Sequence, residues 1–142
     1  MTATDDAVAV LASAQTVVVI DWPSQDVPAG LARAGLGVWV KGGPRPDQYT
    51  QYEVAGADVV VRQAGHAPDH ADLVYAYRPL DELPGILALA ETVGARAIWR
   101  ESASPGDDEQ RARELVEAAG LRYLSGPDIV GAICEARRTR RG

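Results

Sequence analysis

Short apolar runs alternate with amphipathic stretches along most of this 142-residue chain. The runs are rich in β-branched residues, and a continuous run such as Thr16–Ile20 is typical of a parallel strand that is buried on both faces. This pattern predicts strands over residues 16–20, 37–40, 58–62, 73–77, 96–99 and 121–124. Apolar residues at helical spacing predict helices over 4–14, 24–34, 80–93, 107–119 and 127–137.

Glycines follow three of the predicted helices, at Gly35, Gly94 and Gly120. Strands that alternate with helices of about a dozen residues are the signature of right-handed βαβ units. We therefore expect an α/β fold: a doubly wound, mainly parallel sheet of the Rossmann type in a three-layer α/β/α arrangement. Ligands of such sheets lie outside the carboxyl ends of the strands, which here places them beside residues 21–24, 41–43, 77–79 and 100–104.

The segment 44–55 has no clear strand or helix pattern. It contains Tyr49 and Tyr52, and two interpretations remain open: a mobile flap, or a segment that packs over an edge strand. Trp39 and Trp99 lie within strand patterns and are expected in the core.

Composition fits one globular domain. Hydrophobic residues make up 46% of the chain and charged residues 24%, an ordinary mixture that argues against disorder. The apolar runs are too short to span a bilayer, and residues 1–6 carry two acids where a signal peptide would carry bases. We expect a cytoplasmic protein that does not bind membranes, with residues 1–136 forming a single domain.

Basic residues crowd the C-terminal end of the chain, at positions 137, 138, 140 and 141. The rest of the chain is therefore more acidic than the net charge of −6 suggests, and we expect it to repel nucleic acid. Residues 137–142 are expected to form a disordered basic tail that contributes little to stability, because no apolar residue follows Ala136. Contact with RNA or an acidic partner is the alternative for this tail.

No metal site or catalytic group is expected. His66 and His70 have the spacing of a helical metal site, but Pro68 lies between them and no third ligand is evident. Cys134 has no second thiol and is interpreted as a small apolar residue buried under a helix. Glu101 precedes two serines but has no histidine base nearby in sequence.

Two segments carry a family resemblance. Asp72-Leu-Val-Tyr-Ala-Tyr-Arg78-Pro leads through a helix to Gly94-Ala-Arg-Ala-Ile-Trp99, and Ala118-Ala-Gly-Leu121 is followed by Gly126-Pro127-Asp128. This arrangement resembles the CoA-binding domain family, free-standing Rossmann domains related to the nucleotide domain of the succinyl-CoA synthetase α subunit. The resemblance covers nearly the whole chain and implies that CoA or an acyl-CoA is the ligand.

The first loop departs from the pattern of that family. Ser24 matches the family's helix-capping serine, but the phosphate-binding loop before it is reduced to Asp21-Trp22-Pro23. A carboxylate repels a pyrophosphate, and proline offers no N–H donor. The Gly-x-Gly-x-x-Gly fingerprint is also absent, so a tight NAD or FAD site is not expected.

Each candidate ligand residue has an alternative interpretation. Trp22 stacks on adenine or fills the gap left by the short loop, and Arg78 binds a phosphate or pairs with Asp81 or Glu82. Lys41, the only lysine, replaces a family Asn-Pro together with two glycines, which indicates either a phosphate contact or a surface turn. The residues expected at a CoA site are Trp22, Ser24, Lys41, Gly42, Gly43, Tyr77, Arg78 and Glu101.

Three functions remain open on the sequence. The first is a non-catalytic module that binds a nucleotide ligand such as CoA weakly, with no metal. The second is a scaffold that has lost its ligand and binds a protein partner. The third is a small enzyme that uses Lys41, Arg78 and Glu101 in the same crevice.

Overall fold

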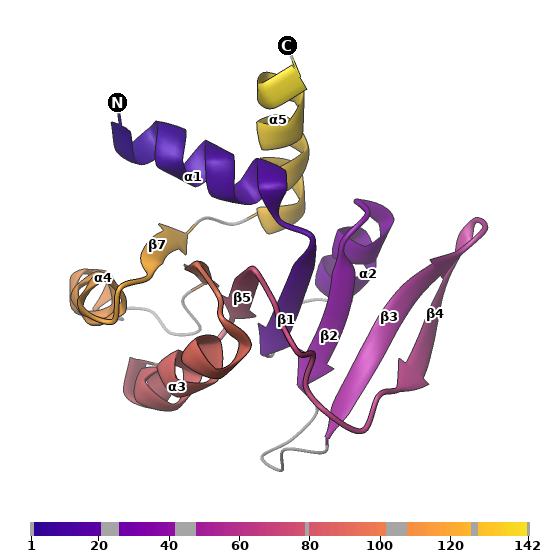
Figure 1. Ribbon diagram of the computed structural model, residues 1–142, viewed down its shortest axis with the longest axis horizontal. Helices are drawn as coiled ribbons and strands as arrows, with labels where there is room; N and C mark the ends of the chain where they lie inside the picture. Colours follow the sequence, from indigo (N-terminus) through magenta and orange to yellow (C-terminus); the bar gives the residue numbers. More distant parts are fainter. Residues whose placement is uncertain are drawn as a thin grey trace.

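A seven-stranded sheet runs through the protein in the order β4-β3-β2-β1-β5-β6-β7 (Figure 1). The computed structural model describes residues 2–20, 26–41, 48–78, 80–101, 108–125 and 128–141. Its strands are β1 (Thr16–Ile20), β2 (Gly37–Lys41), β3 (Tyr49–Ala55), β4 (Asp58–Gln63), β5 (Leu73–Ala76), β6 (Ala97–Arg100) and β7 (Arg122–Ser125). Its helices are α1 (Thr2–Ser13), α2 (Asp26–Arg33), η1 (Leu80–Glu82), α3 (Leu83–Val93), α4 (Glu109–Ala118) and α5 (Ile129–Arg141).

The central part of the sheet is parallel, as the sequence predicts. Strand β1 pairs in parallel with β2 on one side and with β5 on the other, and β6 and β7 continue in the same direction. Strand order therefore reverses between β1 and β5, which defines a topological switch point.

An antiparallel hairpin at one end of the sheet corrects the sequence prediction for residues 44–55, of which 44–47 lie outside the described residues and 49–55 form a strand. These residues form β3, which pairs antiparallel with β2 and, through a turn at Gly56, with β4. The strand was missed because it is only partly covered and mixes polar with apolar residues, so it lacks a continuous apolar run. The segment is thus neither a flap nor a cover over an edge strand; it is a strand of the sheet.

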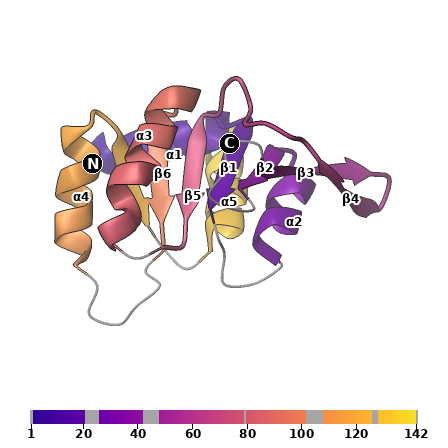
Figure 2. The same cartoon turned by 90° about the horizontal axis from the view of Figure 1, so that it is seen from below.

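Helices cover both faces of the parallel strands. Val17 and Val19 of β1 belong to the core cluster that includes side chains of α1, α2 and α5, whereas Val18 belongs to the cluster on the other face, with side chains of α3 and α4. Figure 2 shows α3 and α4 near one end of the sheet and the β3–β4 hairpin projecting beyond the helices at the other end. Each fully buried valine or leucine contributes about 1.5–3 kcal/mol, so both helical layers are held mainly by this burial.

Asp72, directly before β5, ties that strand to the start of β1. Its carboxylate accepts hydrogen bonds from the backbone N–H groups of Gln15, at 2.8 Å, and Thr16, at 3.1 Å. His70 Nε2 lies 3.3 Å from the other carboxylate oxygen. This junction fixes the two central strands relative to each other at their amino ends.

The C-terminal helix differs from the sequence prediction in length. Helix α5 continues to Arg141, and residues 137–141, expected in a disordered tail, belong to it. The Arg137 guanidinium donates to the carbonyl of Ala34 and, at 3.1 Å, to the carbonyl of Ala14. The apolar pattern could not reveal this, because the contacts join polar atoms from three distant parts of the chain.

Cys134 is exposed rather than buried. Ile129, Ile133 and Ala136 form the core-facing side of α5, and the residue after Ile133 is rotated by about 100° around the helix, away from that side.

None of the helices in the described ranges is long and apolar enough to cross a membrane. The cytoplasmic location stays a prediction.

Candidate functional site

The five parallel strands end in a single row, which we call the carboxyl edge. Register pairs Lys41 with Ile20, Ile20 with Ala76, Ala76 with Arg100 and Arg100 with Ser125. Because the strands end at the same level, the residues that follow them are brought together along the carboxyl edge. Ligands of doubly wound sheets bind at this edge.

The switch point lies near the middle of this edge. The Tyr77 N–H donates to the Ile20 carbonyl at 3.1 Å, so the chain leaving β5 stays beside β1 for one further residue. Tyr77 is half-buried against the core shared by α1, α2 and α5. Tyr77 thus lies at the carboxyl edge, and its part in ligand binding stays a prediction.

Glu101 is held at the switch-point side of β6. Its N–H donates to the Ala76 carbonyl at 2.9 Å, and its carboxylate accepts a hydrogen bond from the hydroxyl of the fully buried Tyr75. The carboxylate is therefore oriented by a core residue. A fixed carboxylate at this place can accept a hydrogen bond from a ligand hydroxyl or amine, but it repels a phosphate.

Arg78 forms the ion pair that the sequence left open as an alternative to phosphate binding. Its Nε donates to Glu82 Oε1 at 2.9 Å, and its Nη2 donates to the second carboxylate oxygen. The two side chains are 36% and 45% exposed, so a ligand phosphate can approach the guanidinium. An anion that binds Arg78 has to compete with Glu82.

Arg100 is a residue of this edge that sequence reasoning did not single out. It is 2% exposed and is the buried charged residue of the described part of the chain. Its Nη2 donates a hydrogen bond to the carbonyl oxygen of Arg78, at 3.3 Å. The signal in the sequence is an arginine that ends the otherwise apolar strand Ala97–Arg100.

Tyr123 lies beside this buried guanidinium. Burial raises the pKa of the Tyr123 hydroxyl, and the hydrogen bond with Arg100 opposes that rise. The hydroxyl therefore stays protonated at neutral pH. Arg113 packs over the ring from α4, with its guanidinium carbon 4.9 Å from the ring centre.

Lys41 is half-buried at the end of β2, on the same edge. The edge thus carries the cations Lys41, Arg78 and Arg100 together with the carboxylates of Glu82 and Glu101. Four expected site residues, Trp22, Ser24, Gly42 and Gly43, lie outside the described residues, as do Asp21 and Pro23.

The two histidines lie in separate surroundings. The His66 ring lies against Trp39, with ring centres 5.5 Å apart, whereas His70 is beside Asp72. Within the described ranges, no group of three or more His, Cys, Asp or Glu residues could hold a metal ion. Trp99 is buried in the core, and Trp39 is only partly buried.

A sequence profile described as CoA binding domain matches residues 20–129 of this chain. The chain belongs to the CoA-binding domain family. The match spans every strand from the end of β1 to β7 and includes the whole carboxyl edge. The sequence resemblance to this family is thereby confirmed.

Solved structures share the fold of this CoA-binding domain. Prb, the PH1109 protein redesigned for binding, is 15% identical, with a TM-score of 0.64, over 93% of this chain and 90% of that one. Cell-free ID.343 from Thermus thermophilus is 19% identical, with a TM-score of 0.60, over 96% and 99%. A protein of unknown function from Methanothermobacter thermautotrophicus is 13% identical, with a TM-score of 0.51, over 87% and 88%. A search of curated proteins finds no match.

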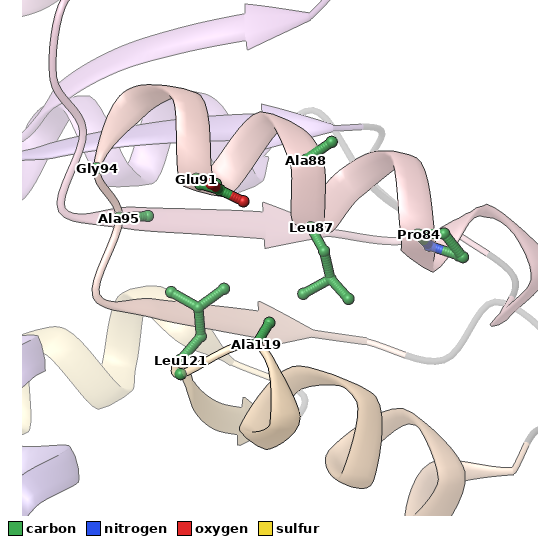
Figure 3. Close-up of a pocket in the computed structure, with 9 residues that line it drawn as sticks. Pro84, Leu87, Ala88, Glu91, Gly94, Ala95, Ala119 and Leu121 are labelled. Atoms are coloured by element: carbon green, nitrogen blue, oxygen red, sulfur yellow. The ribbon is translucent and has the colours of Figure 1, made fainter.

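A groove elsewhere on this CoA-binding domain is less suited to a nucleotide. It has a volume of about 470 Å³ and lies between α3 and the end of α4, where Leu87 and Leu121 point into the space between the helices (Figure 3). Gly94 and Gly120 line it, and they precede β6 and β7, so part of it lies toward the amino ends of those strands. Its charged lining residue is Glu91, an acid, which disfavours a phosphate.

Proposed function

We propose that this protein binds CoA or an acyl-CoA at the carboxyl edge and does not itself catalyse a reaction. One observation supports this most strongly: the family match over residues 20–129 coincides with a switch point between β1 and β5 on that edge. Switch points are where doubly wound sheets bind nucleotides.

The described residues of the edge suggest a division of roles. Lys41 and Arg78 supply positive charge for the phosphates of the ligand. Glu101, oriented by Tyr75, accepts a hydrogen bond from a ribose hydroxyl or the adenine amine. Tyr77 offers an aromatic surface beside β1. From the sequence, we assign stacking on adenine to Trp22, the cap of the phosphate-facing helix to Ser24, and close backbone approach to Gly42 and Gly43.

Binding is expected to be weak, with a dissociation constant in the micromolar range or above. Asp21 adds a negative charge where phosphates approach, Pro23 removes an N–H donor, and Glu82 competes for Arg78. Each unfavourable interaction of about 1.4 kcal/mol weakens binding about tenfold.

Calorimetric titration with CoA at physiological salt tests this proposal. Lys41→Gln and Arg78→Gln should each weaken binding about fivefold, for about 1 kcal/mol per lost charge contact. Arg33→Gln is the matched control, because Arg33 is exposed at the far end of α2 and its substitution changes the net charge equally. Asp21→Gly should strengthen binding. A nanomolar constant, or equal effects of Arg33→Gln and Lys41→Gln, would contradict the assignment.

The alternative of a ligand-free scaffold is supported by one feature, the exposed valines of the β3–β4 hairpin. Mass spectrometry of small molecules released from the denatured protein separates the two. CoA or an acyl-CoA in the released fraction supports the binding module. Absence of both, together with no heat on CoA titration, supports the scaffold.

A further inference from the structure

The β3–β4 hairpin carries the exposed large apolar side chains of the described chain. Val54, Val60 and Val61 are 50%, 45% and 52% exposed. The hairpin forms the end of the sheet, and none of the described helices covers the outer edge of β4 (Figures 1 and 2). Apolar side chains at an edge strand mark a surface that can pair with another strand.

The backbone of β4 presents hydrogen-bonding groups to that outer edge. The Ala64 N–H donates to the Tyr49 carbonyl at 2.9 Å, so these two residues form a hydrogen-bonded pair of the β3–β4 ladder. Such pairs alternate with non-hydrogen-bonded pairs along antiparallel strands. It follows that Val59 and Val61 direct their N–H and C=O groups away from β3, toward the edge.

Two copies of β4 that run antiparallel can bring opposite charges to face each other. Asp58 and Arg62 lie at equal distances from Val60, with a valine on each side of it. When a second β4 runs antiparallel with Val60 opposite Val60, each Asp58 lies opposite the Arg62 of the other copy. Opposite charges in directly opposed positions stabilise a strand pair, and like charges destabilise it.

This register is selected among those that the edge permits. Hydrogen bonding requires the outward-facing residues of the two strands to oppose one another, which allows a two-fold axis at any residue of β4. An axis at Val59 places Asp58 opposite a valine, and an axis at Val61 places Arg62 opposite a valine. Only the axis at Val60 pairs the charges.

We propose that two copies of this chain associate through β4, antiparallel about a two-fold axis at Val60, into one continuous sheet. On one face, the two Val60 side chains meet between two Asp58–Arg62 ion pairs. On the other face, Val59 of each copy meets Val61 of the other. Arg62 already pairs with Glu53 of its own chain, and its five N–H donors allow it to bind a second carboxylate.

Two charge reversals test this register through mixing. Asp58→Arg places Arg opposite Arg in both ion pairs of a dimer, and Arg62→Asp places Asp opposite Asp. In an equimolar mixture of the two variants, both contacts of a mixed dimer are again between opposite charges. We expect sedimentation velocity to show a wild-type dimer, a dimer at least tenfold weaker for each variant alone, and recovery of the dimer in the mixture.

Glu114→Arg on α4 is the control, because it makes the same change in charge as Asp58→Arg at an exposed site on a different element. Circular dichroism of each variant verifies that it is folded. Amide exchange gives a second measurement: the N–H groups of Val59 and Val61 should become protected as the dimer forms. A wild-type protein that remains monomeric to about 1 mM, which corresponds to an association free energy weaker than about −4 kcal/mol, would overturn the proposal. So would a mixture that behaves like the separate variants.

Discussion

Arg137→Ala should destabilise the protein, because Arg137 joins three helices. Its guanidinium donates to the carbonyls of Ala14 and Ala34, the residues that follow the last turns of α1 and α2. Carbonyls at helix C-termini lack partners within the helix and carry the negative end of the helix dipole, so a cation is favourable there. Hydrogen bonds from a charged donor contribute about 1.5–3 kcal/mol when buried.

Arg137 is half-buried, so we expect the two bonds together to contribute about 2–3 kcal/mol. For a domain of this size, that corresponds to a fall in Tm of roughly 6–9 °C. Differential scanning calorimetry at neutral pH measures it. Truncation after Ala136 should lower Tm at least as much, contrary to the expectation from sequence that this segment is dispensable.

Arg138→Ala is the matched control, since the next residue of α5 is exposed and makes a surface ion pair with Glu135. Its Tm should equal that of the wild type within error. The Tm of Arg137→Lys should lie between those of the wild type and Arg137→Ala, because a single ammonium cannot hold both carbonyls in the geometry of a planar guanidinium. Equal Tm values for Arg137→Ala and Arg138→Ala would refute the reasoning.

Two further predictions concern the amino-end junction and the glycine beside it. Burial alone would raise the pKa of Asp72, but hydrogen bonds from two backbone N–H groups and the contact with His70 lower it below its usual value. The resulting stability is present above the unfolded pKa of about 3.9 and is lost as pH falls through the folded value, so Tm should fall more steeply for wild type than for Asp72→Asn in acid; parallel curves would contradict this. Gly94→Ala should cost about 1–2 kcal/mol, because Gly94 has a φ of +73° and a Cβ would lie 3.1 Å from His70 Nδ1. Gly85→Ala, with open space around it in α3, should be neutral or stabilising by up to about 1 kcal/mol, and equal thermal shifts for the two glycine variants would count against the argument.

The parallel strands could be predicted because burial on both faces leaves a continuous apolar run, as in Thr16–Ile20. Strand β3 could not, because its position near the end of the sheet tolerates polar residues between apolar ones. The contacts of Arg137 depend on where three helices end in space, which no local pattern records. The Arg78–Glu82 pair was foreseeable, since Arg78 comes just before a helix start whose first residues include the acids Asp81 and Glu82.

At the candidate site, the positions of Lys41, Tyr77, Arg78 and Glu101 followed from sequence, because each residue ends or follows a parallel strand. Apart from the Arg78–Glu82 pair, the contacts that those side chains make did not follow from sequence. The hydroxyl of Tyr75 that orients Glu101 belongs to an apolar strand, where a tyrosine is indistinguishable from any other core residue. Sequence placed position 100 beside the ligand crevice but did not reveal the burial of Arg100, since a charged residue at a strand end ordinarily points to solvent.

The strand order also bears on how the chain folds. The β3–β4 hairpin joins neighbours in sequence through a short turn, whereas Asp72 meets the Gln15 backbone across 57 positions. Closing a long loop costs conformational entropy before the contacts at its ends repay it, so the hairpin can form while the centre of the sheet is still open. A partly folded chain would then already expose the edge of β4 to other copies of the chain. Dilute refolding should therefore give a higher yield than concentrated refolding.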